Sequence, residues 1–194
     1  MIAIMIPAPF DSLPTHSLRQ RRFADGGLLF AQGDDSLGPW VVLQGEVRLI
    51  RQGETGLSVC LHRARAGETL AEASLFSDRY HCDAEALPGT LVVNVARDAT
   101  LRRMQEDAGF ARALAALLAR QVQDGRRRLA FQRIRRADER VLAALAELGA
   151  PDRIVDFAAE VGLTPEATYR ALATLVQRGL VRKTARGRYF LASV

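Results

Sequence analysis

The spacing of apolar residues changes near Asp98, and this change divides the chain into two parts with different secondary structure. Between about residues 22 and 97, short apolar runs such as 91–95 are separated by turn residues such as Gly45-Glu46. Short runs with turn signals at this interval are typical of a β-sandwich or barrel rather than of βαβ units. We therefore predict that the first part is mostly β, either a sandwich or a barrel.

The second part begins with a long helical pattern. From Phe110 the apolar residues recur at helical spacing, and no proline interrupts them before Pro151. The apolar stripe is longer than one short helix needs, so a second surface must cover it. A helix from another subunit and the chain's own β domain are the two candidates. We favour the first and predict a dimerisation helix.

The remaining residues have the pattern of a winged helix-turn-helix. A helix over about 136–148 is followed by a short helical stretch at 156–161 and by Gly162, where the chain can reverse. Thr164 can cap the next helix, at about 165–178, and Pro165 suits the first position of that helix. Both residues are favoured there because the first amides of a helix lack partners within the helix. Two short apolar segments flank Ala185-Arg186-Gly187, which is a hairpin signal. The predicted fold class is α+β.

The expected domain organisation follows from these elements. We predict a β domain at 1–105, a dimerisation helix at 106–134 and a winged helix-turn-helix at 135–194. This leaves little of the 194 residues for any further domain.

Charge separates along the same division. Residues 1–109 hold 11 basic and 14 acidic residues, whereas residues 110–194 hold 16 and 8. The net charge of +5 therefore arises from a −3 part and a +8 part. A basic domain suits a polyanion, because each phosphate contact needs a cationic donor. The alternative is an arginine-rich background, since every basic residue except Lys183 is arginine.

The predicted recognition helix carries residue types that read DNA. Arg170 can donate to guanine or to a phosphate, Glu166 can accept from a cytosine amino group, and Tyr169 shares their exposed N-terminal face. Thr164, beside free helix amides, suits a phosphate oxygen. The hairpin adds four side chains that are candidates for contact with the DNA backbone: Arg182, Lys183, Arg186 and Arg188.

The sequence resembles the transcription regulators related to the cyclic-AMP receptor protein and the fumarate-nitrate regulator. The resemblance spans roughly residues 18–191 and rests on Gly26-Gly27-Leu28-Leu29-Phe30, Ala66-Gly67-Glu68, Glu72-Ala73-Ser74-Leu75-Phe76 and the helix-turn-helix. It implies that residues 1–105 form an antiparallel, jelly-roll-like β-roll that senses an effector, followed by the dimerisation helix and the winged helix-turn-helix. It also implies a homodimeric regulator that binds palindromic double-stranded DNA, with RNA polymerase as a candidate further partner. Residues matching Glu166 and Arg170 contact bases in that family. The preceding position, often basic there, is Pro165, so a different DNA sequence is expected.

The effector site departs from the nucleotide-binding members of that family. Their Gly-Glu pair corresponds to Ala71-Glu72, and their phosphate-binding Arg-Ser or Arg-Thr pair corresponds to Cys82-Asp83. Val122 and Gln123 align with the positions that offer hydroxyls to the base. Because a thiol and a carboxylate replace the cation and hydroxyl, we do not expect cyclic AMP to bind, and we predict no cofactor. Glu72 has a structural role as an alternative to ligand contact.

Other residues suggest alternatives. His81, Cys82 and Cys60 invite a haem, metal or redox reading, since imidazole and thiolate are soft ligands. Adjacent residues on a strand point to opposite faces, which disfavours one ion held by both His81 and Cys82. A jelly-roll metal enzyme would need clustered histidines. The three histidines of this sequence, His16, His62 and His81, are scattered and form no His-x-His pair. A sensing module whose helices contact only proteins is a third class.

Nothing in the sequence predicts secretion or membrane insertion. No apolar run approaches the roughly 18 residues that a membrane span needs, and the N-terminus lacks a basic region followed by a long apolar stretch. We expect a cytoplasmic, non-enzymatic protein. Its two cysteines exclude a disulfide framework.

Overall fold

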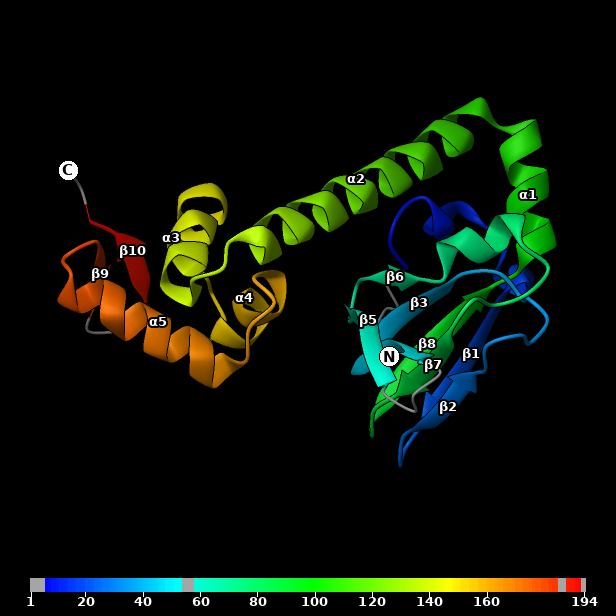
Figure 1. The fold of residues 1–194 in the computed structure, drawn as a ribbon. Coiled ribbons are helices and arrows are strands. Elements are labelled where there is room, and N and C mark those ends of the chain that lie inside the picture. Colours follow the sequence, from blue (N-terminus) through cyan, green and yellow to red (C-terminus); the bar gives the residue numbers. More distant parts are fainter. Residues whose placement is uncertain (1–5, 54–57, 185–187, 193–194) are drawn as a thin grey trace. The chain divides into compact units, whose positions relative to one another are not determined.

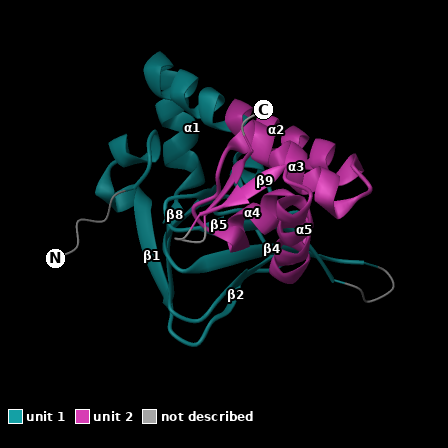
Figure 2. Cartoon of the chain, turned by 90° about the vertical axis from the view of Figure 1, so that its left-hand side faces the viewer, with its two compact units in different colours: residues 1–118 teal, residues 119–194 magenta. Residues whose placement is uncertain are grey.

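A computed structural model describes residues 6–53, 58–184 and 188–192 of the chain. The chain divides into two compact units, Met1–Leu118 and Ala119–Val194, which Figure 2 shows in different colours. Helix α2, which spans Ala108–Arg133, crosses the boundary between them.

The first unit holds two four-stranded antiparallel sheets (Figure 1). One has the strand order β1-β8-β3-β6, with its strands at Leu18–Phe23, Thr90–Val95, Trp40–Gln44 and Thr69–Leu70. The other has the order β2-β7-β4-β5, with its strands at Gly27–Phe30, Asp83–Ala86, Glu46–Gln52 and Ser58–Arg65. This arrangement confirms the predicted antiparallel β-roll and the α+β class.

The central strands β3 and β8 of the first sheet are largely buried on both faces, which explains their unbroken apolar runs, whereas the edge strand β1 is mostly exposed. Val42 and Val92 face the interior that the two sheets share, while their neighbours Val41 and Val93 pack on the other side. That outer face is covered by Phe10 of the 3₁₀ helix η1, by Leu75 of η3 and by the start of α2. The 3₁₀ helices span Phe10–Ser12 (η1), Thr15–Ser17 (η2) and Glu72–Phe76 (η3).

Gly38 permits a close approach of two chain segments before β3. Its φ is +104°, and a Cβ there would lie 2.4 Å from the carbonyl oxygen of Val95 and 2.9 Å from the amide nitrogen of Arg97. Both atoms are backbone atoms that cannot turn aside. A side chain at position 38 would therefore separate β8 from the segment that leads into β3.

Two helices, not one, follow the sheets. Helix α1 spans Arg97–Glu106 and α2 spans Ala108–Arg133. Asp107 separates them, because its carboxylate accepts hydrogen bonds from the amides of Gly109 (2.8 Å) and Phe110 (3.0 Å) and so begins a new helix.

The apolar stripe of α2 changes its surroundings along the helix. Phe110 and Leu114 are buried against the outer face of the first sheet, with Leu117 and Leu118 partly buried beside them. Further along, the Val122 and Leu129 side chains are 51% and 61% exposed in the single chain. The chain's own β domain thus covers the first part of the stripe.

The second unit contains three short helices and a two-stranded sheet. Their bounds are Ala137–Leu148 (α3), Ile154–Glu160 (α4), Pro165–Gln177 (α5), Val181–Lys183 (β9) and Tyr189–Leu191 (β10). A core that includes Phe131, Val141, Phe157 and Leu172 joins them to the end of α2. Among the described residues, no helix is both long and apolar enough to cross a membrane.

Candidate nucleic-acid interface

Helices α4 and α5 form the helix-turn-helix at the predicted position. Gly162 in the turn has a φ of +65°, a conformation that favours glycine. Thr164 caps α5: its hydroxyl oxygen accepts a 3.1 Å hydrogen bond from the Ala167 amide, and Pro165 occupies the first helical position. Gly162, Thr164 and Pro165 are the local sequence signals from which the turn was predicted.

Helix α5 buries one face and exposes the other. Ala171, Leu172 and Leu175 pack into the core of the second unit. The N-terminal turns of the opposite face expose Glu166, Tyr169 and Arg170, the three side chains predicted to meet bases. Neither Glu166 nor Arg170 has an ion-pair partner among the described residues. Both charged groups are therefore available to an external ligand.

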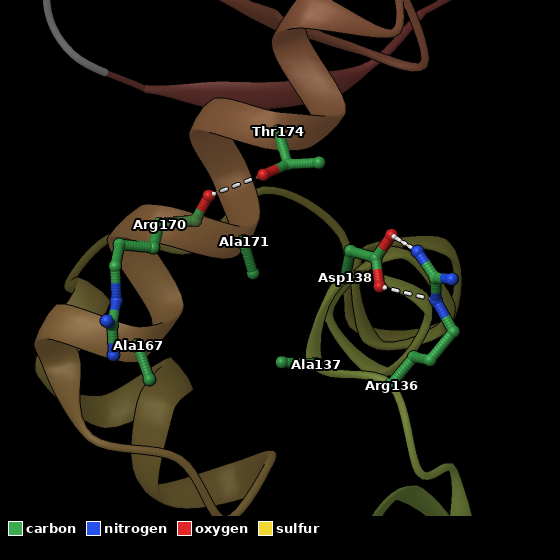
Figure 3. Close-up of a pocket in the computed structure, with 7 residues that line it drawn as sticks. All are labelled: Arg136, Ala137, Asp138, Ala167, Arg170, Ala171 and Thr174. Atoms are coloured by element: carbon green, nitrogen blue, oxygen red, sulfur yellow. Dashed lines mark hydrogen bonds and ion pairs between the residues drawn. The ribbon is translucent and has the colours of Figure 1, made fainter.

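A shallow pocket of about 430 Å³ lies between the first turn of α3 and the exposed face of α5. Figure 3 shows Arg170 on one side of this pocket and Arg136 on the other. Three of the residues that line the pocket are alanines, whose side chains are small. The lining residues are Arg136, Ala137, Asp138, Ala167, Arg170, Ala171 and Thr174.

Asp138 neutralises two of the arginines near this pocket. Its side chain is only 11% exposed and accepts hydrogen bonds from Arg136 Nε (3.2 Å) and Nη2 (3.0 Å) and from Arg178 Nη1 (2.8 Å). The Arg136 hydrogen bond lowers the pKa of the Asp138 carboxyl below its usual value. Asp138 therefore remains ionised and holds the start of α3 to the end of α5.

The hairpin places most of its predicted cations at the surface, but not all of them are free. Arg182 is exposed and has no ion-pair partner among the described residues. Lys183 lies 5.5 Å from the ring centre of Tyr189, and Arg188 forms a 2.9 Å ion pair with the exposed Asp152. Arg186, also predicted to contact DNA, lies outside the described residues.

The predicted effector residues lie in different environments. Glu72 is buried and accepts a hydrogen bond from the Thr69 hydroxyl, next to Ala71 in the left-handed region with a φ of 59°. Cys82 is buried, and burial raises the pKa of its thiol despite the opposing field of the exposed Arg51. Asp83 accepts a 2.7 Å hydrogen bond from the Gln32 amide.

The two other predicted effector residues, Val122 and Gln123, are exposed on α2 in the second unit. The structure therefore describes the surroundings of Glu72, Cys82 and Asp83 within the β-roll.

An aromatic cluster fills the β-roll interior near Cys82. Phe30 and Tyr80 stack with their ring centres 3.7 Å apart. The Trp40 indole nitrogen donates a 3.0 Å hydrogen bond to the Tyr80 hydroxyl, which itself donates to the Gly38 carbonyl at 3.0 Å. Burial raises the pKa of Tyr80 above its usual value, so this hydroxyl keeps its proton and can donate.

The residues of the haem, metal or redox alternative do not converge. His81 is exposed whereas the neighbouring Cys82 is buried, and Cys60 is exposed on β5. Both cysteines are free thiols. Within the described ranges, no three His, Cys, Asp or Glu residues are grouped so that they could hold a metal ion.

Sequence reasoning missed the residues that join the helices of the second unit. No role was predicted for Asp138 or Arg140 at the start of α3, yet both form hydrogen bonds with other elements. The nearest sequence signal was their position in the first turns of an amphipathic helix. That position alone does not show which distant carbonyls or side chains they meet.

Comparison with known proteins gives matches in both units. A family model described as a cyclic nucleotide-binding domain matches residues 20–107, and a model described as an IclR helix-turn-helix domain matches residues 140–185. The cyclic AMP receptor protein of Thermus thermophilus is 29% identical over 172 residues, which cover 84% of this chain and 80% of that protein.

Solved structures show the same fold over most of the chain. The Thermus thermophilus catabolite activator protein aligns with a TM-score of 0.51 and 28% identity, covering 91% of this chain and 86% of its own. FixK2 from Bradyrhizobium japonicum aligns with a TM-score of 0.62 and 21% identity, covering 91% and 93%. The second likeness supports the fold alone.

The fold and the matches together define a DNA-binding transcription regulator that combines a cyclic nucleotide-binding domain with a helix-turn-helix. More particularly, the chain is a homologue of the Crp/Fnr family regulators, which confirms the resemblance seen in the sequence. These homologues are transcription regulators and not enzymes.

Proposed function

We propose that the protein is a homodimeric, sequence-specific regulator that inserts α5 into the major groove of a palindromic operator. The observation that carries this proposal is the pair of charges Glu166 and Arg170, which have no ion-pair partner among the described residues and lie on the exposed N-terminal face of a capped helix whose other face is buried. In this proposal residues 1–105 form the sensor domain, 106–134 the dimerisation helix and 135–194 the DNA reader.

Each candidate contact has a distinct role. Arg170 donates to guanine O6 and N7 or to a phosphate, and Glu166 accepts from a cytosine amino group. Thr164 and the free amides beside it meet a phosphate oxygen, and Tyr169 packs at the groove edge. Arg182, Lys183, Arg186 and Arg188 supply further backbone contacts. Arg188 must exchange its Asp152 partner for a phosphate, so we expect it to contribute less than Arg182.

A second copy of the chain is the partner that we propose for the open part of the α2 stripe. Val122 and Leu129 are seven residues apart, so they lie on one side of the helix and can meet the same residues of another α2. A symmetric dimer would present two copies of α5 to half-sites about one DNA turn, roughly 34 Å, apart.

We further propose that the β-roll does not bind cyclic nucleotides. A cyclic phosphate needs a cation and a hydroxyl, but Cys82 is a buried thiol with a raised pKa and Asp83 adds a negative charge. Glu72 is engaged with Thr69. Calorimetric titration with cyclic AMP and cyclic GMP should give no saturable heat. Saturable binding at micromolar concentration would contradict this part of the proposal.

DNA selection from a random-sequence pool tests the central proposal. The full-length protein should enrich a palindrome, and Arg170→Ala should lose the preference for it while keeping weak binding that disappears as salt rises. Arg120→Ala is the matched control, because Arg120 is an exposed arginine on α2 without an ion-pair partner in the described part of the chain. An Arg170→Ala protein with unchanged preference would overturn the assignment of α5.

Experiments on the same purified protein test the remaining classes of function. If the wild-type protein binds no DNA even at low salt, the helical unit contacts proteins instead. Metal analysis and the absorbance spectrum of the purified protein test the metal, haem and enzyme alternatives directly, because each requires a bound metal or chromophore.

A further inference from the structure

Arg140, in the first turns of α3, donates hydrogen bonds to two separate chain segments. Its Nε and Nη2 atoms donate to the Ile134 carbonyl at 3.0 and 2.8 Å, and Nη2 also reaches the Gln132 carbonyl at 3.5 Å. Its Nη1 atom donates to the Val161 carbonyl at 3.1 Å and to the Gly162 carbonyl at 3.4 Å. One half-buried side chain thus bridges the end of α2 and the turn before α5.

The chemistry of these acceptors explains why an arginine is needed. The last carbonyls of a helix have no partner within the helix and carry partial negative charge, and both α2 and α4 end at this point. A guanidinium group offers five N–H donors in a fixed planar fork, so it can bond to both helix ends at once. A lysine ammonium has three donors at one point and cannot span the same carbonyls.

Further contacts fix the same joint on either side of Arg140. Arg128 of α2 forms a 3.2 Å ion pair with Glu160, the last residue of α4. The Gln132 side chain lies against the turn so closely that a Cβ on Gly162 would be 3.0 Å from its Cγ and Nε2 atoms. The last turns of α2 and the helix-turn-helix are therefore held together as one body within the second unit.

We infer that Arg140 is a positioning residue that sets the direction of α5 relative to the end of α2. The inference rests on the proposed function, because it concerns how a dimer reads two half-sites. If α2 forms the dimer seam, the Arg140 joint passes the geometry of the seam to both recognition helices. It therefore fixes the half-site spacing that the dimer accepts, without any contact between Arg140 and DNA.

The experiment compares binding to four duplexes built on the palindrome that the wild-type protein selects. One keeps the selected spacing, one has a base pair added between the half-sites, one has a base pair removed, and one carries a single half-site. Each added or removed base pair rotates and shifts the half-sites relative to each other. The wild-type protein should therefore lose at least about tenfold in affinity on the two altered spacings.

Arg140→Gln and Arg140→Lys should relax this dependence on spacing. We expect the penalty for the altered duplexes to fall to within about threefold for Arg140→Gln, with Arg140→Lys between it and the wild type. Affinity for the single half-site should stay within about twofold of wild type, because the reading face of α5 is untouched. Arg120→Gln, which removes an exposed α2 arginine, should keep the full wild-type penalty.

The outcomes distinguish this inference from the proposed function. If the wild-type protein selects no DNA sequence, the proposed function fails first. If it selects a palindrome but Arg140→Gln keeps the wild-type spacing penalty, only the role of Arg140 is overturned. Should both Arg140 variants fail to fold, the double variant Arg128→Gln/Gln132→Ala loosens the joint from the α2 side, and it must show the same relaxed spacing for the inference to stand.

Discussion

Arg178 donates a 2.8 Å hydrogen bond to Asp138, and this contact joins the residue after α5 to the first turn of α3. Arg136, the residue before α3, forms an ion pair with the same carboxylate. The orientation of the recognition helix thus depends on one ionised carboxyl group at the rim of the pocket, in addition to the apolar core beneath it.

This contact predicts a pH dependence of stability. The Arg136 hydrogen bond lowers the pKa of Asp138 in the folded state, so its contribution is present above the unfolded value of about 4 and is lost as pH falls through the folded pKa. Asp138→Asn should lower the melting temperature at pH 7 but not below the folded pKa. Far-UV circular dichroism melts between about pH 2 and pH 7 check this.

Asp152→Asn is the control for that experiment, since its carboxylate is 91% exposed and pairs with the half-exposed Arg188. Exposed ion pairs contribute little to stability, so this variant should melt as the wild type does at every pH. An Asp138→Asn protein with the same deficit at low pH as at neutral pH would count against an ionic role for Asp138.

Removing the cap of α5 should destabilise the second unit. Thr164→Ala leaves the Ala167 amide without its hydroxyl acceptor and should lower the free energy of unfolding by about 1 kcal/mol. Urea titration followed by circular dichroism measures the change. Thr174→Ala is the control, because the Thr174 hydroxyl only donates to the Arg170 carbonyl within the exposed helix. Equal losses for both variants would argue against a capping role.

A carboxylate in the open part of the α2 stripe should prevent dimerisation. Val122→Asp would bury an unpaired charge in the proposed seam, and we expect the dimer dissociation constant to rise at least about a hundredfold. Sedimentation equilibrium gives the constant. Arg120→Asp places the same group two residues earlier, nearly on the opposite side of the helix, and should remain dimeric. A monomeric wild-type protein would refute the seam itself.

Gly38 should tolerate no side chain. Gly38→Ala places a methyl group 2.4 Å from the Val95 carbonyl oxygen and should destabilise the β-roll by about 2–4 kcal/mol. Gly33 has a similar φ of +89° but has nothing within 4 Å of its Cβ position, so Gly33→Ala should cost only the backbone strain of about 1 kcal/mol. Thermal unfolding of the two variants compares them directly, and equal costs would show that crowding at Gly38 is unimportant.

The features that could be predicted from sequence are those with local causes. The helix-turn-helix was readable because Gly162, Thr164 and Pro165 each favour one backbone conformation at a fixed offset. The β-roll was readable because its turn glycines recur between apolar runs. Helix α1 was missed, because nearly all of its residues lie in the range assigned to the β domain. Asp107, which ends α1 and begins α2, resembles any other surface carboxylate until its hydrogen bonds from the Gly109 and Phe110 amides are seen.

The features that could not be predicted depend on contacts between distant residues. Arg140 is one of many arginines, and only the meeting of two helix ends around it gives it five hydrogen bonds to four carbonyl groups. The division of the α2 stripe has a similar origin, because Leu114 and Val122 have the same apolar character and differ only in whether the first sheet reaches them.

Trp40 is the single tryptophan of the chain, and its indole nitrogen bonds to Tyr80 only two residues before Cys82. The β-roll therefore contains its own fluorescent reporter. A small molecule that enters near Cys82 and displaces Tyr80 would change the polarity around the indole and shift its emission. Candidate effectors can thus be screened on the unlabelled protein, with no knowledge of the operator and no DNA in the assay.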